Sequence, residues 1–333
     1  MSTGALAPYE PLAVVTGASG FVGSHIVDAL LASGARVRAV VRGTSSRRWL
    51  TGKQVEFADS PLDDAAGLRR AVEGADWVIH AAGLIRARNA AEFHECNVAG
   101  TARLLAAARD ASVRRFVFVS SQAAAGPSLD GRPVTESHAP HPVSTYGETK
   151  RLAEELVLRE RDRMAVTVIR PPAVYGPRDT AILKVFTLAK RHLQPVLRSG
   201  GTFSMIHAED LASAVLAVLS HDEAAGEIFF ASEPDRTDYD ELGALVRAAL
   251  GTWSVRVAVP RWAMMGIALG AEGFARVTGV APLLTREKLR EISAGDWVCS
   301  SAKIRERAGW SPRVPLAAGI KSTADWYRAA GWL

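Results

Sequence analysis

The sequence predicts an α/β fold built on a doubly wound parallel sheet, followed by a smaller C-terminal α/β region. Two observations lead to this prediction: short β-rich segments alternate with helical segments over the first 170 residues, and a glycine-rich turn follows the first strand. Strands that alternate with helices of about 10–15 residues are typical of parallel sheets covered by helices on both faces. We therefore divide the chain into residues 1–170 and 171–333.

The elements of the first region follow from local residue patterns. Residues 12–16 are β-rich, and residues 21–32 place apolar side chains at helical spacing until Gly34 ends the helix. Residues 89–111 are rich in Ala and Leu and predict a long helix, and residues 145–161 predict a charged amphipathic helix. Further strands are expected over residues 37–41, 54–57, 77–80, 115–120 and 166–170.

In the second region strands and helices alternate less regularly. Short strands are expected near residues 204–207, 227–230 and 255–257, separated by helices of varied length. No internal repeat or low-complexity linker separates this region from the first. We therefore expect the two regions to pack together, with chain elements that cross back to the first sheet.

Composition excludes several classes of protein. The chain has 333 residues, of which 48% are hydrophobic and 23% charged, as in soluble globular proteins. The net charge of +5 is spread along the chain, so we expect a solvated surface and no nucleic-acid partner. The two cysteines, Cys96 and Cys299, lie outside any zinc or disulfide pattern, which suits a reducing compartment and predicts no metal site.

The chain shows no targeting or membrane-spanning pattern. Residues 1–11 lack the basic and apolar segments of a signal peptide. The apolar stretch at residues 262–271 is about half the length needed to span a bilayer. We therefore expect a cytoplasmic protein without a membrane span.

A glycine-rich turn marks a nucleotide-binding site. Gly17, Gly20 and Gly23 follow the first strand and open the first helix. Such glycines allow a tight turn, close approach of the backbone to a pyrophosphate and tight packing of helix on strand, and the helix N-terminus attracts the phosphate charge. Residues 1–170 are thus predicted to form a Rossmann-type dinucleotide-binding domain, and residues 171–333 mainly a substrate-binding region.

The end of the second strand indicates which cofactor is preferred. An acidic residue there would bind the ribose hydroxyls of NAD, whereas an arginine accommodates the phosphate of NADP. This chain has Arg42 and no acid at that position. NADP(H) is therefore preferred and NAD(H) stays possible, because Arg42 could also be an ordinary exposed loop residue.

Tyr146 and Lys150 form a candidate acid–base pair. The i, i+4 spacing places both side chains on one face of the predicted helix. A free tyrosine has a pKa near 10, and a neighbouring cation stabilises the phenolate, so we expect Lys150 to move the pKa of Tyr146 toward neutrality. Ser120 and Ser121 end the strand that precedes this helix.

The order of these motifs resembles the short-chain dehydrogenase/reductase superfamily, in its extended, epimerase/dehydratase-like and 3β-hydroxysteroid-dehydrogenase-like branch. The resemblance covers nearly the whole chain. The matching motifs are TGASGFVG (16–23), HAAG (80–83), NVAGT (97–101), VSS…G (119–126), YGETK (146–150), RPPAVYGP (170–177) and MIHAEDLA (205–212).

The resemblance implies a role for each matching residue. Tyr146 is the acid/base, Lys150 its electrostatic partner and Ser121 the hydroxyl that orients the reacting oxygen; Ser121 is preferred to Ser120 because it lies five residues before Gly126. The resemblance also places Asn97 in the helix beneath the site, as a further catalytic candidate. The alternative is that Asn97 is an ordinary helix residue exposed to water. The implied cofactor contacts are Gly17, Ser19, Gly20, Phe21 and Val22 at the pyrophosphate, Asp59 at adenine, Ala81, Ala82 and Gly83 after the fourth strand, and the backbone around Pro171 and Val174 near the nicotinamide. A homodimer is also implied.

Departures from the sugar-modifying relatives point to the substrate. Gln122 and Ala123 replace the acidic pair with which dehydratases eliminate water, and Ala173 replaces an asparagine that binds a diphosphate in epimerases. The missing polar anchors favour an uncharged, rather hydrophobic small molecule. Apolar side chains that could line its pocket, or form helix core, or lie on a membrane surface, are Trp262, Met264, Met265, Ile267, Leu269 and Phe274.

The sequence thus predicts an NADP(H)-preferring oxidoreductase that interconverts a ketone and a secondary alcohol. One alternative is a nucleotide-sugar epimerase that uses a tightly held NAD. A second alternative is a regulator that senses NADP without chemistry, although such proteins commonly lack the Tyr–Lys pair.

Overall fold

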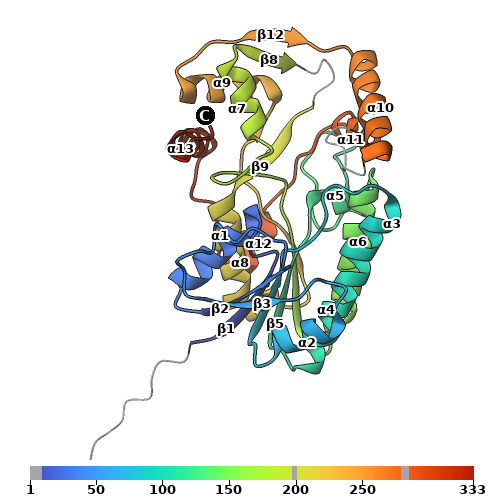
Figure 1. The fold of residues 1–333 in the computed structure, drawn as a ribbon, viewed down its shortest axis with the longest axis vertical. Coiled ribbons are helices and arrows are strands. Elements are labelled where there is room, and N and C mark those ends of the chain that lie inside the picture. Colours follow the sequence, from blue (N-terminus) through green and yellow to red (C-terminus); the bar gives the residue numbers. More distant parts are fainter. Residues whose placement is uncertain (1–9, 197–200, 279–284) are drawn as a thin grey trace, which may run out of the picture.

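The computed structural model describes residues 10–196, 201–278 and 285–333. The expectation about a signal peptide falls mostly on residues 1–9, outside the described residues. Within them, the central sheet has seven parallel strands in the order β10-β6-β5-β4-β1-β2-β3 (Figure 1). Its strands are β1 (Leu12–Thr16), β2 (Arg36–Val41), β3 (Val55–Asp59), β4 (Trp77–His80), β5 (Arg115–Val119), β6 (Ala165–Arg170) and β10 (Ile228–Phe230).

Helices cover both faces of this sheet, as the alternating pattern predicts. One face carries α1 (Phe21–Ala32), α8 (Ala208–Ser220) and α12 (Ala302–Ala308), and the other carries α2 (Ala65–Val72), α4 (Gly100–Asp110) and α6 (Thr145–Arg159) (Figure 1). Successive residues of β1 point to opposite layers, so Val15 packs with the first set and Val14 with the second. Because helices bury both faces of the sheet, both sets of alternating side chains are apolar, and the sequence of each buried strand is a continuous apolar run.

The chain reverses its direction of winding between β1 and β4, which are neighbours in the sheet. Open α/β sheets bind ligands outside the carboxyl ends of the strands at such a reversal. The turn after β1 and the loop after β4 therefore meet at the place where a nucleotide is expected.

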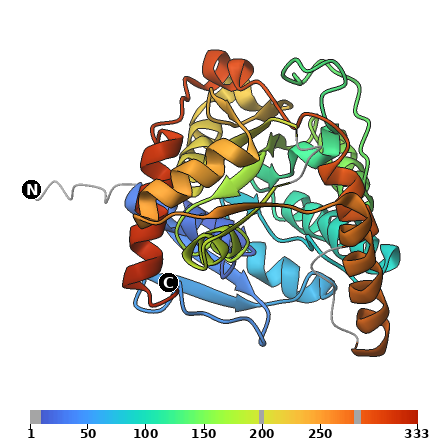
Figure 2. The ribbon, with the colours of Figure 1, turned by 90° about the horizontal axis from the view of Figure 1, so that it is seen from above.

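The C-terminal region forms two small sheets beyond the central sheet, and the sheet of β8 and β12 lies at the far end of the molecule (Figure 1). Figure 2 shows the molecule from that end. One sheet has the order β11 (Arg236–Thr237), β9 (Phe203–His207), β7 (Ala173–Tyr175), and the other pairs β12 (Val255–Ala258) with β8 (Leu193–Val196). A third core joins Tyr175, Phe186, Val246 and Tyr327. The helices of this region are α7 (Leu183–Lys190), α9 (Tyr239–Leu250), α10 (Arg261–Thr278), α11 (Arg286–Ile292) and α13 (Leu316–Ala329).

Several elements after residue 171 return to the first region. Strand β10 extends the central sheet beside β6, and α8 packs against α1. The crossing that the sequence predicts is therefore present, whereas a domain boundary at residue 170 stays a prediction. Among the described residues, no helix is long and apolar enough to cross a bilayer.

The long helix expected over residues 89–111 contains a π-helical turn. Helix α3 (Ala90–His94) continues through the π turn Glu95–Ala99 into α4. Such turns are rare and often occur at functional sites. Helix α2 was not expected, although Asp64 caps its N-terminus by accepting a hydrogen bond from Gly67 N at 2.9 Å.

Candidate active site

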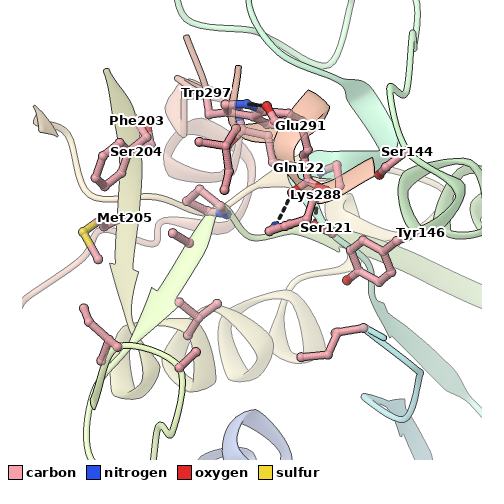
Figure 3. A pocket seen from close by; sticks show the side chains of 18 of the residues that line it. Ser121, Gln122, Ser144, Tyr146, Phe203, Ser204, Met205, Lys288, Glu291 and Trp297 are labelled. Carbon is pink, nitrogen blue, oxygen red and sulfur yellow. Dashed lines mark hydrogen bonds and ion pairs between the residues drawn. The ribbon is translucent and has the colours of Figure 1, made fainter. Parts of the chain in front are cut away.

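A cavity of about 620 Å³ lies where the carboxyl ends of the central strands meet the C-terminal region. Figure 3 shows side chains from both regions around it. Its polar lining includes Ser121, Gln122, Ser144, Tyr146, Lys288 and Glu291. Apolar lining comes from side chains such as Phe93, Val174, Met205 and Trp297.

The two serines after β5 have different surroundings. Ser120 is buried, and its hydroxyl donates to Glu154 Oε1 at 2.5 Å. Ser121 lines the cavity and caps the short helix α5 (Gln122–Ala125), where its Oγ accepts from Ala123 N at 3.1 Å. Because only Ser121 reaches the cavity, the geometry supports the choice of Ser121 over Ser120.

This difference predicts that replacing Ser121 lowers turnover, whereas replacing Ser120 lowers mainly the stability of the fold. Ser121→Ala is expected to lower turnover by about 10²-fold, because it removes a hydrogen-bond donor to the reacting oxygen. Ser120→Ala is expected to keep turnover within a few-fold but to destabilise the fold by about 1–3 kcal/mol, because Glu154 loses a buried donor. Steady-state kinetics and urea unfolding measure the two effects. If Ser120→Ala proved the more damaging to turnover, the assignment would be reversed.

Tyr146 and Lys150 lie one turn apart at the start of α6, whose N-terminus is capped by Ser144. Tyr146 faces the cavity (Figure 3). Lys150 is buried; its Nζ donates to Val119 O at 2.7 Å and lies 4.1 Å from the centre of the Phe118 ring. The pair therefore sits beside the end of β5, as the i, i+4 spacing predicts.

The pKa of Tyr146 moves in the direction opposite to the expected one. Burial raises this pKa to about 12, a hydrogen bond with Ser121 partly opposes the rise, and the charge of Glu291 adds to it. Burial also lowers the pKa of Lys150 to about 7, against the opposing charge of Glu154. The expectation that Lys150 moves the pKa of Tyr146 toward neutrality is therefore wrong for this structure, because desolvation dominates and Lys150 Nζ points to the Val119 carbonyl.

The turn after β1 fits a pyrophosphate. Gly17 has a φ of +69°, and a Cβ on it would lie 2.7 Å from Ala82 N, so a side chain is excluded there. Gly20 is the N-cap of α1 and has no side chain to cap the helix, which leaves the first N–H groups of α1 available to a phosphate. Ser19, Phe21 and Val22 occupy this turn and the first turn of α1.

Arg42 and Asp59 lie together at the expected adenosine end. Val41 and Asp59 are paired in the register of β2 and β3, and a Cβ on Gly43 would lie 3.1 Å from Asp59 Oδ2. Arg42 is exposed, and its guanidinium has no hydrogen-bond or ion-pair partner in the described part of the chain. A free guanidinium suits a phosphate, although the carboxylate of Asp59 is close by.

Asn97 holds the loop that follows β4. Its Oδ1 accepts from Leu84 N at 2.8 Å, and its Nδ2 donates to Leu84 O at 3.0 Å and Thr149 Oγ1 at 3.2 Å. It is buried in the π turn, so the alternative of a helix residue exposed to water is wrong. Because its amide is occupied, Asn97 is placed to position the loop of Ala81, Ala82 and Gly83 rather than to contact substrate.

The two remaining cofactor candidates lie at the start of the C-terminal region. Pro171 is buried, and its carbonyl accepts from Gln122 N at 2.8 Å, which ties the end of β6 to the start of α5. Val174, in β7, lines the cavity. Pro171 therefore lies at the carboxyl end of β6 and Val174 at the wall of the cavity. The resemblance implies that the nicotinamide lies near both.

Several cavity residues were missed by sequence reasoning. Gln122 is buried, and its Nε2 has no hydrogen-bond partner among the described residues. Lys288 and Glu291 form an ion pair of 2.5 Å on α11, and α11 is held at α6 by a hydrogen bond from Thr145 N to Glu287. No local signal predicts this contact, because it joins segments 142 positions apart.

Five of the apolar residues that could line the pocket, form helix core or lie on a membrane surface are absent from the cavity lining. Trp262, Ile267 and Leu269 are exposed on α10, and Met264 and Met265 are half-buried outside the cavity lining. The side chain of Phe274 lies outside the described residues. Helical periodicity shows that α10 has an apolar face, but not what that face meets.

Known proteins share this arrangement. The model of the NAD dependent epimerase/dehydratase family matches residues 13–231. A ceramide reductase of Caulobacter vibrioides is 35% identical over 322 residues, which cover 96% of this chain and 95% of that protein. A 3 beta-hydroxysteroid dehydrogenase/Delta 5-->4-isomerase of Mycobacterium tuberculosis is 30% identical, with 94% and 90% covered. The NAD-bound crystal structure of DesIV, a dTDP-glucose 4,6-dehydratase of Streptomyces venezuelae, matches with a TM-score of 0.78 and 26% identity over 96% of this chain and 98% of that one.

These similarities agree with the site. The family match contains the glycine turn, Ser121, Tyr146 and Lys150, and the relatives are named as a reductase and a dehydrogenase. The match covers more than half of the chain. The chain therefore belongs to the NAD-dependent epimerase/dehydratase family of extended short-chain dehydrogenases/reductases and is an oxidoreductase of that family.

Proposed function

We propose that the protein is an NADP(H)-preferring ketoreductase that reduces a hydrophobic, lipid-like ketone to a secondary alcohol. The observation that carries this proposal is the position of Tyr146 and Ser121 side by side at one end of the cavity (Figure 3). A phenol and a hydroxyl in this arrangement can both bind a carbonyl oxygen. The cavity is large enough for a small-molecule substrate.

The raised pKa of Tyr146 agrees with the proposed reduction, in which the phenol starts in its protonated form. With a pKa of about 12, the phenol stays protonated at neutral pH and is ready to donate its proton. When bound, the cofactor supplies the hydride that adds to the carbonyl carbon. Tyr146 then transfers its proton to the oxygen, and Ser121 holds that oxygen by a hydrogen bond. The ammonium form of Lys150 can stabilise the phenolate that remains only if its Nζ turns from the Val119 carbonyl toward Tyr146.

The substrate class is inferred from the walls of the cavity and from the relatives. Phe93, Val174, Met205 and Trp297 offer apolar surface, and the free Nε2 of Gln122 offers a donor to an acceptor oxygen of the substrate. Two relatives are named for ceramide and for a hydroxysteroid, which are both hydrophobic molecules. We therefore favour a neutral lipid-like ketone that carries a second oxygen.

Arg42 is proposed to confer the preference for NADP. Arg42→Ala is expected to raise the KM for NADPH about tenfold or more and to leave the KM for NADH nearly unchanged, because a charge-assisted hydrogen bond contributes about 1.5–3 kcal/mol. Arg47→Ala serves as the control, since the Arg47 guanidinium packs 4.5 Å from the Phe57 ring centre. Equal losses with both cofactors would contradict this role.

The reaction itself is tested by following NADPH consumption with a panel of hydrophobic ketones and of nucleotide sugars. We expect net consumption with the ketones only. Interconversion of nucleotide-sugar epimers without net consumption would instead identify an epimerase. Binding of NADPH without turnover across the whole panel would identify a sensor.

A further inference from the structure

The two-stranded sheet of the C-terminal region presents an apolar face to solvent. Val255 is paired with Leu193, and Val257 with Pro195, so these residues share one face of the sheet. Val255 is 54% exposed, and Leu193 and Val257 are also exposed. The alternate residue Gln194 faces inward, where it is buried and contacts Arg247.

Helix α10 and the start of β12 extend this apolar face. Trp262, in the first turn of α10, is 78% exposed, and Leu269, seven positions later and therefore on the same side of the helix, is also exposed. Trp253, which precedes β12, is exposed and stacks on His192 with ring centres 4.3 Å apart. Figure 1 shows β8, β12 and α10 at the same end of the molecule. We call Leu193, Trp253, Val255, Val257, Trp262 and Leu269 the apolar surface.

Soluble proteins rarely leave so many large apolar side chains together in water, and such patches mark interaction sites. Two of these six residues are tryptophans, which favour the boundary between lipid headgroups and acyl chains. None of the described helices is long and apolar enough to span a bilayer. Contact with a membrane would therefore be peripheral.

Basic residues adjoin the apolar surface. Lys190 and Arg191 end α7 immediately before β8, and both are exposed without an acidic partner in the described part of the chain. Basic side chains beside an apolar surface attract anionic lipid headgroups. The same surface of a second copy would offer no acidic partner to Lys190 and Arg191, whereas anionic headgroups carry the opposite charge.

The apolar surface is linked to the active-site cavity through α11. This helix packs against α10 and contributes Lys288 and Glu291 to the cavity. We propose that the apolar surface docks the protein onto the anionic face of a lipid bilayer, beside the cavity that receives a hydrophobic substrate. This docking goes beyond the proposed reaction and does not depend on it.

Flotation of the full chain with lipid vesicles tests the proposal. Wild-type protein is expected to bind vesicles of phosphatidylcholine with phosphatidylglycerol more tightly than vesicles of phosphatidylcholine alone. The double variant Val255→Ser/Trp262→Ser is expected to bind at least about tenfold more weakly, because it removes apolar side chains from both β12 and α10. Leu129→Ser, which changes an 80% exposed apolar residue outside this surface, should bind within about twofold of wild type.

A charge variant and a stability control complete the test. Lys190→Gln/Arg191→Gln is expected to lose about tenfold of the affinity for anionic vesicles and little for neutral ones. Unchanged thermal unfolding midpoints show that the variants fold. The proposal is overturned if wild type does not bind vesicles, or if the Val255/Trp262 variant binds like wild type. Dissociation of a dimer by that variant, with vesicle binding unchanged, would assign the surface to a second copy and overturn the proposal as well.

Discussion

Replacing Tyr146 with phenylalanine is expected to reduce NADPH-dependent ketone reduction by about 100-fold or more, the scale of acid–base catalysis. The variant keeps the ring that lines the cavity and removes the proton donor. The glycine turn and α1 are untouched, so the dissociation constant for NADPH should stay within a few-fold of wild type. Turnover kinetics and fluorescence titration of NADPH measure the two quantities.

Tyr239→Phe is the matched control for this prediction. The Tyr239 ring also lines the cavity, where burial raises the pKa of its phenol, but it projects from α9 beside Phe203, with ring centres 5.0 Å apart. Its hydroxyl has no role in the proposed reaction, and turnover should change by only a few-fold. Near-normal turnover of Tyr146→Phe, or equal losses in both variants, would remove Tyr146 from the mechanism.

Replacing Glu154 with alanine is expected to cause the largest loss of stability, about 3–5 kcal/mol, because it leaves a buried charge without its partner. Glu154 on α6 forms two hydrogen bonds with Arg170 on β6, at 2.9 and 2.6 Å, and their side chains are 3% and 2% exposed. It also accepts from Ser120, next to the proposed catalytic serine. Urea unfolding measures the change in the free energy of unfolding.

The control lies on the same helix. Glu148 pairs with Arg151 at 2.7 Å on the surface of α6. Exposed ion pairs contribute little, so Glu148→Ala should destabilise by less than about 1 kcal/mol. Similar losses for the two variants would show that the buried pair contributes no more than a surface one.

Apolar spacing in the sequence predicted the strands and helices whose formation depends on neighbouring residues of the chain. Strand β1 and helix α1 have the bounds that their apolar residues predict, because β1 is buried on both faces and α1 along one stripe. The π turn around Asn97 was not predicted, since it depends on hydrogen bonds to Leu84 and Thr149 from other segments. Likewise, the spacing of Tyr146 and Lys150 predicts their shared face but not the desolvation that raises the pKa of the phenol.

The sequence predicted those cavity residues that lie in recognisable motifs and missed those that lie outside them. Ser121 could be chosen from its distance to Gly126, and the structure supplies the reason, since Ser120 is engaged by Glu154. Lys288 and Glu291 could not be found, because tertiary contacts of α11 bring them to the cavity. For Trp262 the sequence left pocket lining, helix core and membrane surface open, and the structure places it on the outside; an apolar pattern does not identify what packs against it.

The return of β10 to the central sheet limits how the protein can be divided. A fragment that ends at residue 170 would leave β6 as an open edge strand, because β10 supplies its outer neighbour. It would also uncover the apolar residues of α1 that α8 now shields. Unpaired edges and bared apolar helices promote aggregation. The nucleotide-binding half is therefore not expected to be obtainable as a separate, well-behaved polypeptide.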